Sequence, residues 1–298
     1  MSKHKMIASP IKWVGGKRRF RERIVSLIPE HSCYVELFSG AAWVLFGKEP
    51  SDVEILNDID GELVNFFRVV RDSHEDLISA FDWDLVSREE FDRLAGLDTT
   101  SLSELERAHR FFYLIMASWG GELNYPRLQT SVSDKGHGNR LIGALKRLRK
   151  RIEPVHRRLR TVIIENLDWE ACFDRYDKDK VLMYIDPPYP DNKVNYAHNM
   201  RSWNEHERLA DRLEAAKCKW ILSSYDTPEV RALYERHLII PVESYSGMNT
   251  TKAGGSRVKN VEVLVLNFDP PDTAFTNVRT TAAPKKTETQ AAQIRMSL

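Results

Sequence analysis

Long apolar runs are missing from this sequence, and cysteine is scarce. No stretch approaches the roughly 18 apolar residues of a membrane-spanning helix, and no apolar run follows the basic start, so we expect neither membrane insertion nor secretion. The three cysteines, Cys33, Cys172 and Cys218, lie far apart and show no metal-ligand spacing. This pattern is typical of free thiols in a reducing cytoplasm. It predicts a cytoplasmic protein without a metal site.

Net charge is small as well, with a formal value of +1 over 298 residues. Composition alone therefore does not predict a nucleic-acid-binding protein. The charges are nevertheless segregated, because segments 3–23 and 146–160 are strongly basic while acidic residues concentrate in 72–106. Such a distribution suits a protein with one face for phosphates. A solvated helix face is the alternative interpretation of either basic segment alone.

The most informative motif is Asp-Pro-Pro-Tyr at 186–189, which follows the apolar run 181–185. The run has the pattern of a buried parallel strand, and the two prolines forbid ladder pairing and helix directly after it. In open α/β sheets, ligands bind where strands end in this way. The turn offers a carboxylate, rigid carbonyls and an aromatic face, which suit a flat nitrogenous ring with an exocyclic amino group. The alternative is an ordinary strand-ending turn.

The order of predicted elements indicates an α/β fold. Strands are expected at 33–37, 52–57, 162–164, 181–185, 220–223, 237–242 and 261–268. Helices are expected at 43–46, 61–71, 75–81, 88–94, 105–119, 141–160, from 168, at 204–216 with Asn204 as its cap, and from 228. The last two strands are joined by the long glycine-rich loop 247–259, so they are expected to pair antiparallel.

This order of predicted strands and helices divides the chain into four parts. Residues 1–71 and 151–269 form the two parts of a catalytic sheet domain, and 72–150 form a mainly helical insertion. Residues 270–298 are rich in Pro, Thr, Ala and Gln, so we expect a disordered tail. The first part also carries a small-residue turn, 38–42, after its first strand, and Asp58 about twenty residues further on. That spacing is typical of a nucleotide-binding turn with a ribose-binding carboxylate, although Asp58 or Asp60 can also cap the next helix.

Lys-Trp-Val-Gly-Gly-Lys at 12–17 precedes the first strand, so it is not a phosphate loop of the usual strand–loop–helix type. Its glycines can fold over a ligand, with Trp13 as an apolar wall and Lys17 reaching a carboxylate. The alternative is a plain turn before the helix that contains 20–27.

Taken in order, these motifs resemble the Dam-like, α-group DNA adenine-N6 methyltransferases. The resemblance lies in 12–17, Glu-Leu-Phe-Ser-Gly at 36–40, Asn-Asp-Ile-Asp at 57–60 and the Asp-Pro-Pro-Tyr turn. Segments 221–227 and 254–264 are also similar to that family. The resemblance covers roughly residues 10–70 and 160–268. It implies a Rossmann-like methyltransferase sheet with an antiparallel last strand. The insertion is then a target-recognition domain.

The resemblance also implies S-adenosylmethionine as methyl donor and double-stranded DNA as substrate, with the protein acting as a monomer. The implied cofactor-binding residues are Trp13, Lys17, Glu36, Phe38, Gly40, Asp58 and Asp186. The implied catalytic residues, which receive the target adenine, are Asp186, Pro187, Pro188 and Tyr189. Ala42 departs from the family pattern because a glycine is usual there.

The chemistry requires no metal and no covalent nucleophile, since the sulfonium already activates the methyl group. Hydrogen bonds from the adenine amine to Asp186 and the Pro187 carbonyl strengthen as positive charge develops on the nitrogen. A duplex hides that amine, so the base must be flipped out. Residues expected to contact DNA lie in the basic segments, the insertion and the glycine-rich loop. They are Lys12, Asn124, Arg127, Arg140, Lys146, Arg147, Arg149, Lys150, Lys252, Arg257 and Lys259.

Two other classes of function are compatible with the same residues. The fold can act on another planar amino nitrogen, such as cytosine N4, RNA adenine or a protein amide, although the basic segments favour nucleic acid. A non-catalytic DNA-binding module with a degenerate pocket is the second alternative, and only Ala42 favours it. Whether the setting is restriction–modification, a phage or housekeeping stays open.

Overall fold

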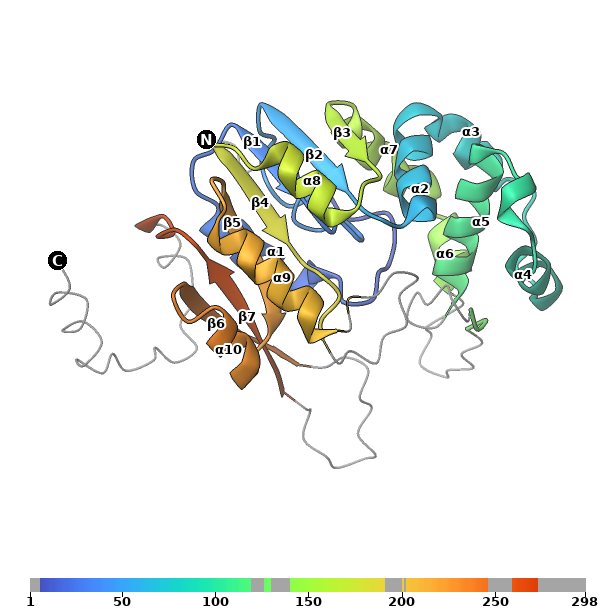
Figure 1. Cartoon of the computed structure of the whole chain (residues 1–298). Coiled ribbons are helices and arrows are strands. Elements are labelled where there is room, and N and C mark those ends of the chain that lie inside the picture. The colour runs from blue at the N-terminus through green and yellow to red at the C-terminus, as the bar shows by residue number, and fades with distance from the viewer. Residues whose placement is uncertain are drawn as a thin grey trace, which may run out of the picture.

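A mixed sheet forms the centre of the molecule in the computed structural model (Figure 1), which describes residues 6–118, 126–129, 140–190, 200, 202–245 and 259–272. Its strand order is β3-β2-β1-β4-β5-β7-β6. The strands are β1 (Cys33–Glu36), β2 (Val53–Asn57), β3 (Val162–Glu165), β4 (Val181–Ile185), β5 (Lys219–Tyr225), β6 (Leu238–Tyr245) and β7 (Lys259–Leu266). The first five are parallel to one another, and β7 is antiparallel to both β5 and β6. The predicted α/β fold with an antiparallel last strand is confirmed.

Helices cover both faces of this sheet. They are α1 (Arg21–Leu27), α2 (Gly61–Asp72), α3 (His74–Ser79), α4 (Arg88–Ala95), α5 (Glu104–Ala117), α6 (Arg140–Leu145), α7 (Leu148–Leu159), α8 (Trp169–Tyr176), α9 (Trp203–Glu214) and α10 (Pro228–Leu233). Two short 3₁₀ turns, η1 (Lys17–Arg19) and η2 (Thr99–Ser101), complete the list for the described residues. In Figure 1, α8 and α9 lie across the same face of the sheet, and α2 to α6 gather beside β3.

The two faces have separate hydrophobic cores, which explains why the central strands are apolar throughout rather than alternating. On β4, Leu182 and Tyr184 pack into the core shared with α1, α2, α5 and α7. Met183 and Ile185 pack into the other core, with α8, α9 and α10. The first core continues without a break into α3 to α6, so the helices of the predicted insertion pack directly against the sheet and its helices.

Three local predictions are wrong. Residues 43–46 form hydrogen-bonded turns and not a helix, because the two bonds of helical spacing there, from the Phe46 amide to the Ala42 carbonyl and from the Lys48 amide to the Val44 carbonyl, are not consecutive, and the Leu45 amide between them donates to Glu36. The cap of α9 is Ser202, paired with Glu205 in a capping box two residues before the predicted one. The predicted helix 141–160 is split into α6 and α7, since Arg147 leaves the helical conformation with φ −122° and ψ 15°.

The predicted insertion boundary at residue 150 falls inside α7. The predicted tail 270–298 lies, after residue 272, outside the described residues. Among the residues that are described, no helix combines the length and the apolarity needed to cross a bilayer.

Candidate active site

The sheet has its topological switch point between β1 and β4. These strands are neighbours, with Glu36 opposite Tyr184, but the chain continues from β1 toward β2 and from β4 toward β5. The segments that follow the two strands therefore diverge at one edge of the sheet, which is where a parallel α/β sheet accommodates ligands. The glycine turn at 38–42 and the Asp186 corner both lie there.

Asp186 is the first residue after β4, and two donors bind one of its oxygens. The Ser223 hydroxyl donates to Oδ1 at 2.7 Å, and the Lys17 ammonium lies 2.8 Å from the same atom. The Tyr184 hydroxyl, 3.1 Å from Ser223 Oγ, completes a chain of donors that ends on the carboxylate. The Asp186 side chain is 18% exposed. Its position is therefore fixed by the protein while part of its surface stays accessible.

Lys17 comes from the distant N-terminal segment and reaches the centre of this edge. Its ammonium donates to the Gly15 carbonyl at 2.8 Å and lies 3.8 Å from Glu262 Oε2, in addition to its bond with Asp186. It also lies 4.9 Å from the centroid of the Tyr189 ring, within cation–π distance. The segment that contains Trp13 and Lys17 is thus part of the Asp186 corner, and not only a turn before α1.

Tyr189 is almost completely buried. Its hydroxyl donates to Glu262 Oε2 at 3.0 Å, and its ring meets Tyr225 edge-on at a centroid distance of 4.5 Å. Both prolines of the corner stay close to the protein, with Pro187 buried and Pro188 half-buried. The structure therefore brings together Lys17, Asp186 and Tyr189; the sequence predicted all three as site residues, but it did not predict the contact of Lys17 with Asp186.

Ser223 and Glu262 take part in this cluster, but the sequence did not single them out as site residues. Glu262 is the one acid within the otherwise apolar segment 261–266, which is a usable signal because a buried carboxylate requires a partner. Ser223 carries no such signal. Its proximity to Asp186 depends on the pairing of β4 with β5.

The glycine turn after β1 is fastened to the end of β2 by Asp58. Gly40 has φ +46°, a conformation that favours glycine, and its amide donates to Asp58 Oδ2 at 2.9 Å. Asp58 Oδ1 accepts from the Asp60 amide at 3.0 Å. Burial raises the pKa of Asp58 to about 6, although these amides oppose the shift. The cap of α2 is Asp60, whose carboxylate accepts from Glu62 and Leu63, so Asp58 is not needed as a helix cap.

Trp13 packs directly against Gly40. A Cβ atom added at Gly40 would lie 2.8 Å from Trp13 Cδ1, closer than such atoms can approach. The indole and the backbone of the turn therefore form one surface, which only glycine permits. Phe38, which follows β1, is half-buried on the opposite side of the sheet, against the core with α8 to α10.

We expect Gly40→Ala to lower the free energy of unfolding by about 1–2 kcal/mol, because the left-handed backbone disfavours a side chain and Trp13 must move. Urea denaturation followed by circular dichroism measures the change. Gly96→Ala is the matched control, since Gly96 has φ −85° and the nearest atom to an added Cβ lies at 3.4 Å. Equal stability of the Gly40 variant and the wild type would contradict the close packing of Trp13.

Glu36 lies inside the protein beneath the same turn. It accepts hydrogen bonds from the Tyr34 hydroxyl at 3.0 Å and from the Leu45 amide, and it is 1% exposed. Burial raises the pKa of Glu36 to about 8, against the effect of these donors. Glu36 therefore ties the end of β1 to the segment that follows the glycine turn.

Ala42 has φ +53° and is fully buried in the core that faces α2 and α5. Glycine is the residue that this conformation favours, so the departure from the motif is accommodated at some cost in backbone strain. The burial of its methyl group offsets part of that cost.

The residues predicted to contact DNA differ in their environments. Arg127, Lys146, Arg147, Arg149 and Lys150 are exposed. Arg149 forms an ion pair with Glu75, and Arg147 donates to the Gly143 carbonyl. Asn124, Lys252 and Arg257 lie outside the described residues, and for Arg140 and Lys259 only the backbone is described. The Lys12 ammonium nitrogen is buried, so we do not retain Lys12 as a phosphate contact.

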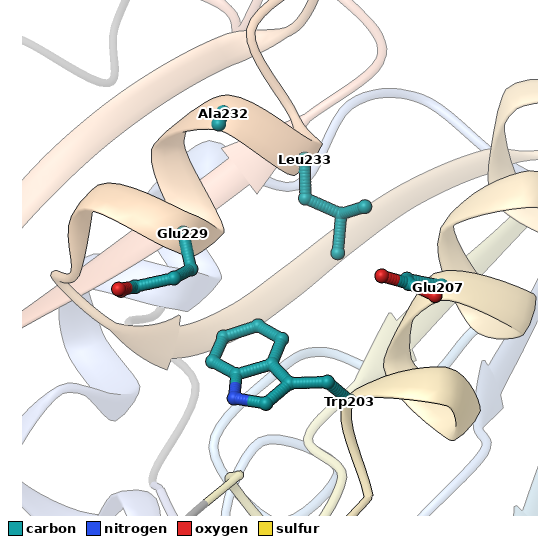
Figure 2. A pocket seen from close by; sticks show the side chains of 5 residues that line it. All are labelled: Trp203, Glu207, Glu229, Ala232 and Leu233. Carbon is teal, nitrogen blue, oxygen red and sulfur yellow. The ribbon is translucent and has the colours of Figure 1, made fainter.

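A second concave feature lies away from the Asp186 cluster. A groove between α9 and α10 is lined by Trp203, Glu207, Glu229, Ala232 and Leu233 (Figure 2), and none of these belongs to the Asp186 cluster. In the part of the chain that the structure describes, no group of three His, Cys, Asp or Glu side chains is arranged to hold a metal ion.

Comparison with known proteins agrees with this geometry. Residues 13–248 match the family model described as D12 class N6 adenine-specific DNA methyltransferase. The chain is 28% identical over 295 residues to the Type II methyltransferase M1.LlaDCHI of Lactococcus lactis subsp. cremoris, covering 90% of this chain and 98% of that protein. It is 25% identical over 249 residues to the DNA adenine methylase of Haemophilus influenzae, covering 75% of this chain and 82% of that protein.

Proposed function

The chain belongs to the D12 class of N6 adenine-specific DNA methyltransferases, and from this membership we propose how its residues carry out methyl transfer. The methyl donor is S-adenosylmethionine, and the acceptor is the N6 amino group of an adenine flipped out of double-stranded DNA. The protein acts as a monomer in the cytoplasm. The observation that carries the proposal is the Asp186 carboxylate, held by Lys17 and Ser223 beside the switch point of the sheet.

The residues around the glycine turn fit the proposed cofactor. Gly40 lets the Trp13 indole pack against the turn, so that Trp13 supplies an apolar wall there, and Asp58 supplies an acceptor for ribose hydroxyls. Lys17, Asp186 and Phe38, which lies on the other side of the sheet from Trp13, complete the proposed cofactor-binding set. Glu36 supports the turn from beneath and lies next to the proposed position of the methionine part. When bound, the sulfonium supplies an activated methyl group, so these residues need only bind and orient.

Asp186 and the Pro187 carbonyl are proposed to accept the two hydrogens of the adenine amine. These bonds make the nitrogen more tetrahedral and strengthen as positive charge develops on it, which lowers the barrier to attack. The amine loses its proton late, because an alkylated ammonium is a much stronger acid than the amine. Pro188 holds the corner rigid, since it cannot continue a strand or donate a hydrogen bond.

We propose that the flipped base stacks on Tyr189; because this ring is 6% exposed without DNA, the side chains that cover it must move when the base enters. Flipping costs a few kcal/mol, and stacking on an aromatic ring returns about 1–3 kcal/mol. Exposed basic residues near the α6–α7 junction, Lys146, Arg147, Arg149 and Lys150, are proposed to bind phosphates together with Arg127. The insertion 72–150 is proposed to supply target recognition.

Expression in bacteria that lack N6-methyladenine tests this function. Enzymatic digestion of the purified DNA and mass spectrometry of the nucleosides should show N6-methyldeoxyadenosine in cells with the wild-type protein and far less in cells with Asp186→Asn. Detection of N4-methyldeoxycytidine would mean that the acceptor is cytosine and not adenine. Methylation of RNA alone would mean that the acceptor is not DNA. Sequencing that detects modified bases in the same DNA would identify the recognition site.

Binding of S-adenosylmethionine should weaken as the pH falls through about 6. Burial raises the pKa of Asp58 to about 6, and only the ionised carboxylate is a strong acceptor for ribose hydroxyls. At pH 5 roughly one molecule in ten keeps Asp58 ionised, so affinity should be about tenfold lower than at pH 8. Calorimetric titrations between pH 5 and 8 measure this. Asp58→Asn should bind weakly at every pH, and a wild-type profile in that variant would exclude Asp58 as the group.

A further inference from the structure

Glu262 brings a second carboxylate to the Asp186 corner. Because β7 is antiparallel, its first residues lie at the sheet edge where β4 and β5 end, and Glu262 stands opposite Tyr225 of β5 and Val242 of β6. The Glu262 side chain is 15% exposed. A carboxylate in such a position loses most of its hydration and depends on donors from the protein.

One oxygen of Glu262 serves two groups of the site. Oε2 accepts the Tyr189 hydroxyl at 3.0 Å and lies 3.8 Å from the Lys17 ammonium. The same ammonium lies 2.8 Å from Asp186 Oδ1. The Lys17 ammonium is therefore placed between two carboxylates, and in this structure its closer ion-pair partner is Asp186.

This placement creates a conflict for the reaction. The Asp186 carboxylate must attract the positive charge that develops on the adenine nitrogen, but an ammonium at 2.8 Å already neutralises most of its field. Lys17 cannot simply withdraw into the interior, because an unpaired buried charge is costly. A second carboxylate within reach of the same ammonium resolves the conflict.

We propose that Glu262 is a positioning residue for methyl transfer, which takes over the Lys17 ammonium when the adenine amine binds Asp186 and holds the Tyr189 ring through its hydroxyl. This inference rests on the proposed function. The ammonium needs to move by about one ångström toward Glu262, which rotation of the terminal torsions of a lysine provides. Asp186 then regains its charge for the amine without leaving Lys17 unpaired.

The surroundings of Glu262 are consistent with this role. The pKa of Glu262 lies above its usual value, because burial raises it and Asp186 adds to the rise, while Lys17 and the hydrogen bond from Tyr189 lower it in part. The ionised form of Glu262 is thus favoured by a closer Lys17. Movement of the ammonium toward Glu262 therefore stabilises the charge that receives it.

Glu262→Gln separates the charge from the hydrogen bond. The amide oxygen still accepts the Tyr189 hydroxyl, but it cannot pair with Lys17. We expect kcat to fall by about 100-fold, a loss typical of electrostatic groups at a reacting centre, while KM for S-adenosylmethionine changes by less than about threefold. Tyr189→Phe removes only the hydroxyl and should lower kcat by about tenfold. Rates are measured with tritiated cofactor on plasmid DNA from a host without adenine methylation.

Glu243→Gln is the matched control, since Glu243 is exposed on the neighbouring strand and pairs in register with the residue before Glu262. It should keep wild-type kinetics. Calorimetric cofactor binding and the melting temperature of Glu262→Gln should stay near the wild-type values. A kcat within twofold of wild type in Glu262→Gln would overturn the inference, and so would a loss of kcat that is accompanied by equal losses of cofactor binding and thermal stability.

The failure of this inference can be distinguished from that of the proposed function. If the wild-type protein transfers no methyl group to adenine, the proposed function is wrong, and the inference falls with it. If the wild type is active and Glu262→Gln is equally active, only the role of Glu262 is wrong.

Discussion

Asp186→Asn should abolish most methyl transfer, lowering kcat by about 100- to 1000-fold. The substitution keeps the size of the side chain and one acceptor oxygen, but it removes the negative charge that stabilises the positive charge developing on the adenine amine. Lys17 keeps Glu262 as a neighbour at 3.8 Å, so the fold should persist. Binding of S-adenosylmethionine, measured by calorimetry, should remain within a few-fold of wild type.

Asp226→Asn provides a matched control for this prediction. Asp226 follows β5 as Asp186 follows β4, and its side chain is similarly accessible at 17%, but it pairs with Arg231 and not with the cluster. Its kcat should stay within about twofold of wild type. Comparable losses in both variants would indicate a general effect of removing carboxylates from this edge, and unchanged turnover in Asp186→Asn would exclude the proposed mechanism.

Arg158→Ala should lower the free energy of unfolding by about 3–5 kcal/mol, the cost of breaking a buried ion pair by removing one partner. Arg158 of α7 binds both oxygens of Glu54 on β2 and donates to the Leu45 carbonyl at 3.2 Å. Lys48 binds Glu54 at 2.6 Å from the other side. Without the guanidinium, Glu54 keeps only Lys48 as a charged partner, the hydrogen bonds from Arg158 to Glu54 and to the Leu45 carbonyl are lost, and a cavity remains.

Urea denaturation at pH 7 measures this change, with Arg157→Ala as the control. The Arg157 side chain is 69% exposed and lies 3.9 Å from Glu153, so its loss should change the free energy of unfolding by less than about 0.5 kcal/mol. Similar values for the two variants would contradict a structural role for Arg158.

The contribution of the Glu54–Arg158 ion pair to stability should decrease at low pH. Burial acts to raise the pKa of Glu54, but hydrogen bonds from Arg158 and Lys48 outweigh it and hold the pKa below its usual 4.5. The stabilisation is therefore complete above pH 4.5 and is lost as the pH falls through the folded-state pKa.

The positions of the strands were predictable because each strand is an apolar segment bounded by turn residues. Buried on both faces, β1, β4 and β5 have no polar alternation, and their ends are marked by the residues that follow, such as Asp186 and its prolines. Since parallel strands end at one edge, the meeting of Gly40, Asp58 and Asp186 at that edge also followed from the sequence.

The parts that sequence reasoning missed depend on contacts between distant segments. Arg149 and Arg158 stand in the same basic segment, yet Arg149 is exposed and Arg158 is buried against Glu54. Which side of α7 faces β2 is decided by packing, not by composition. That Ser223 and Glu262 both belong to the Asp186 cluster likewise depends on the register of β5 with β7, which no local pattern specifies.

The ion pair between α7 and β2 also bears on how the two substrates are held. The proposed phosphate-binding residues Arg149 and Lys150 stand at the start of α7, Arg158 fastens the far end of that helix to Glu54, and β2 continues from Glu54 to the residue before Asp58. A buried ion pair thus connects the helix that carries the proposed phosphate-binding residues to the strand that leads to the proposed ribose-binding carboxylate. We therefore expect release of the DNA to leave the position of Asp58 unchanged.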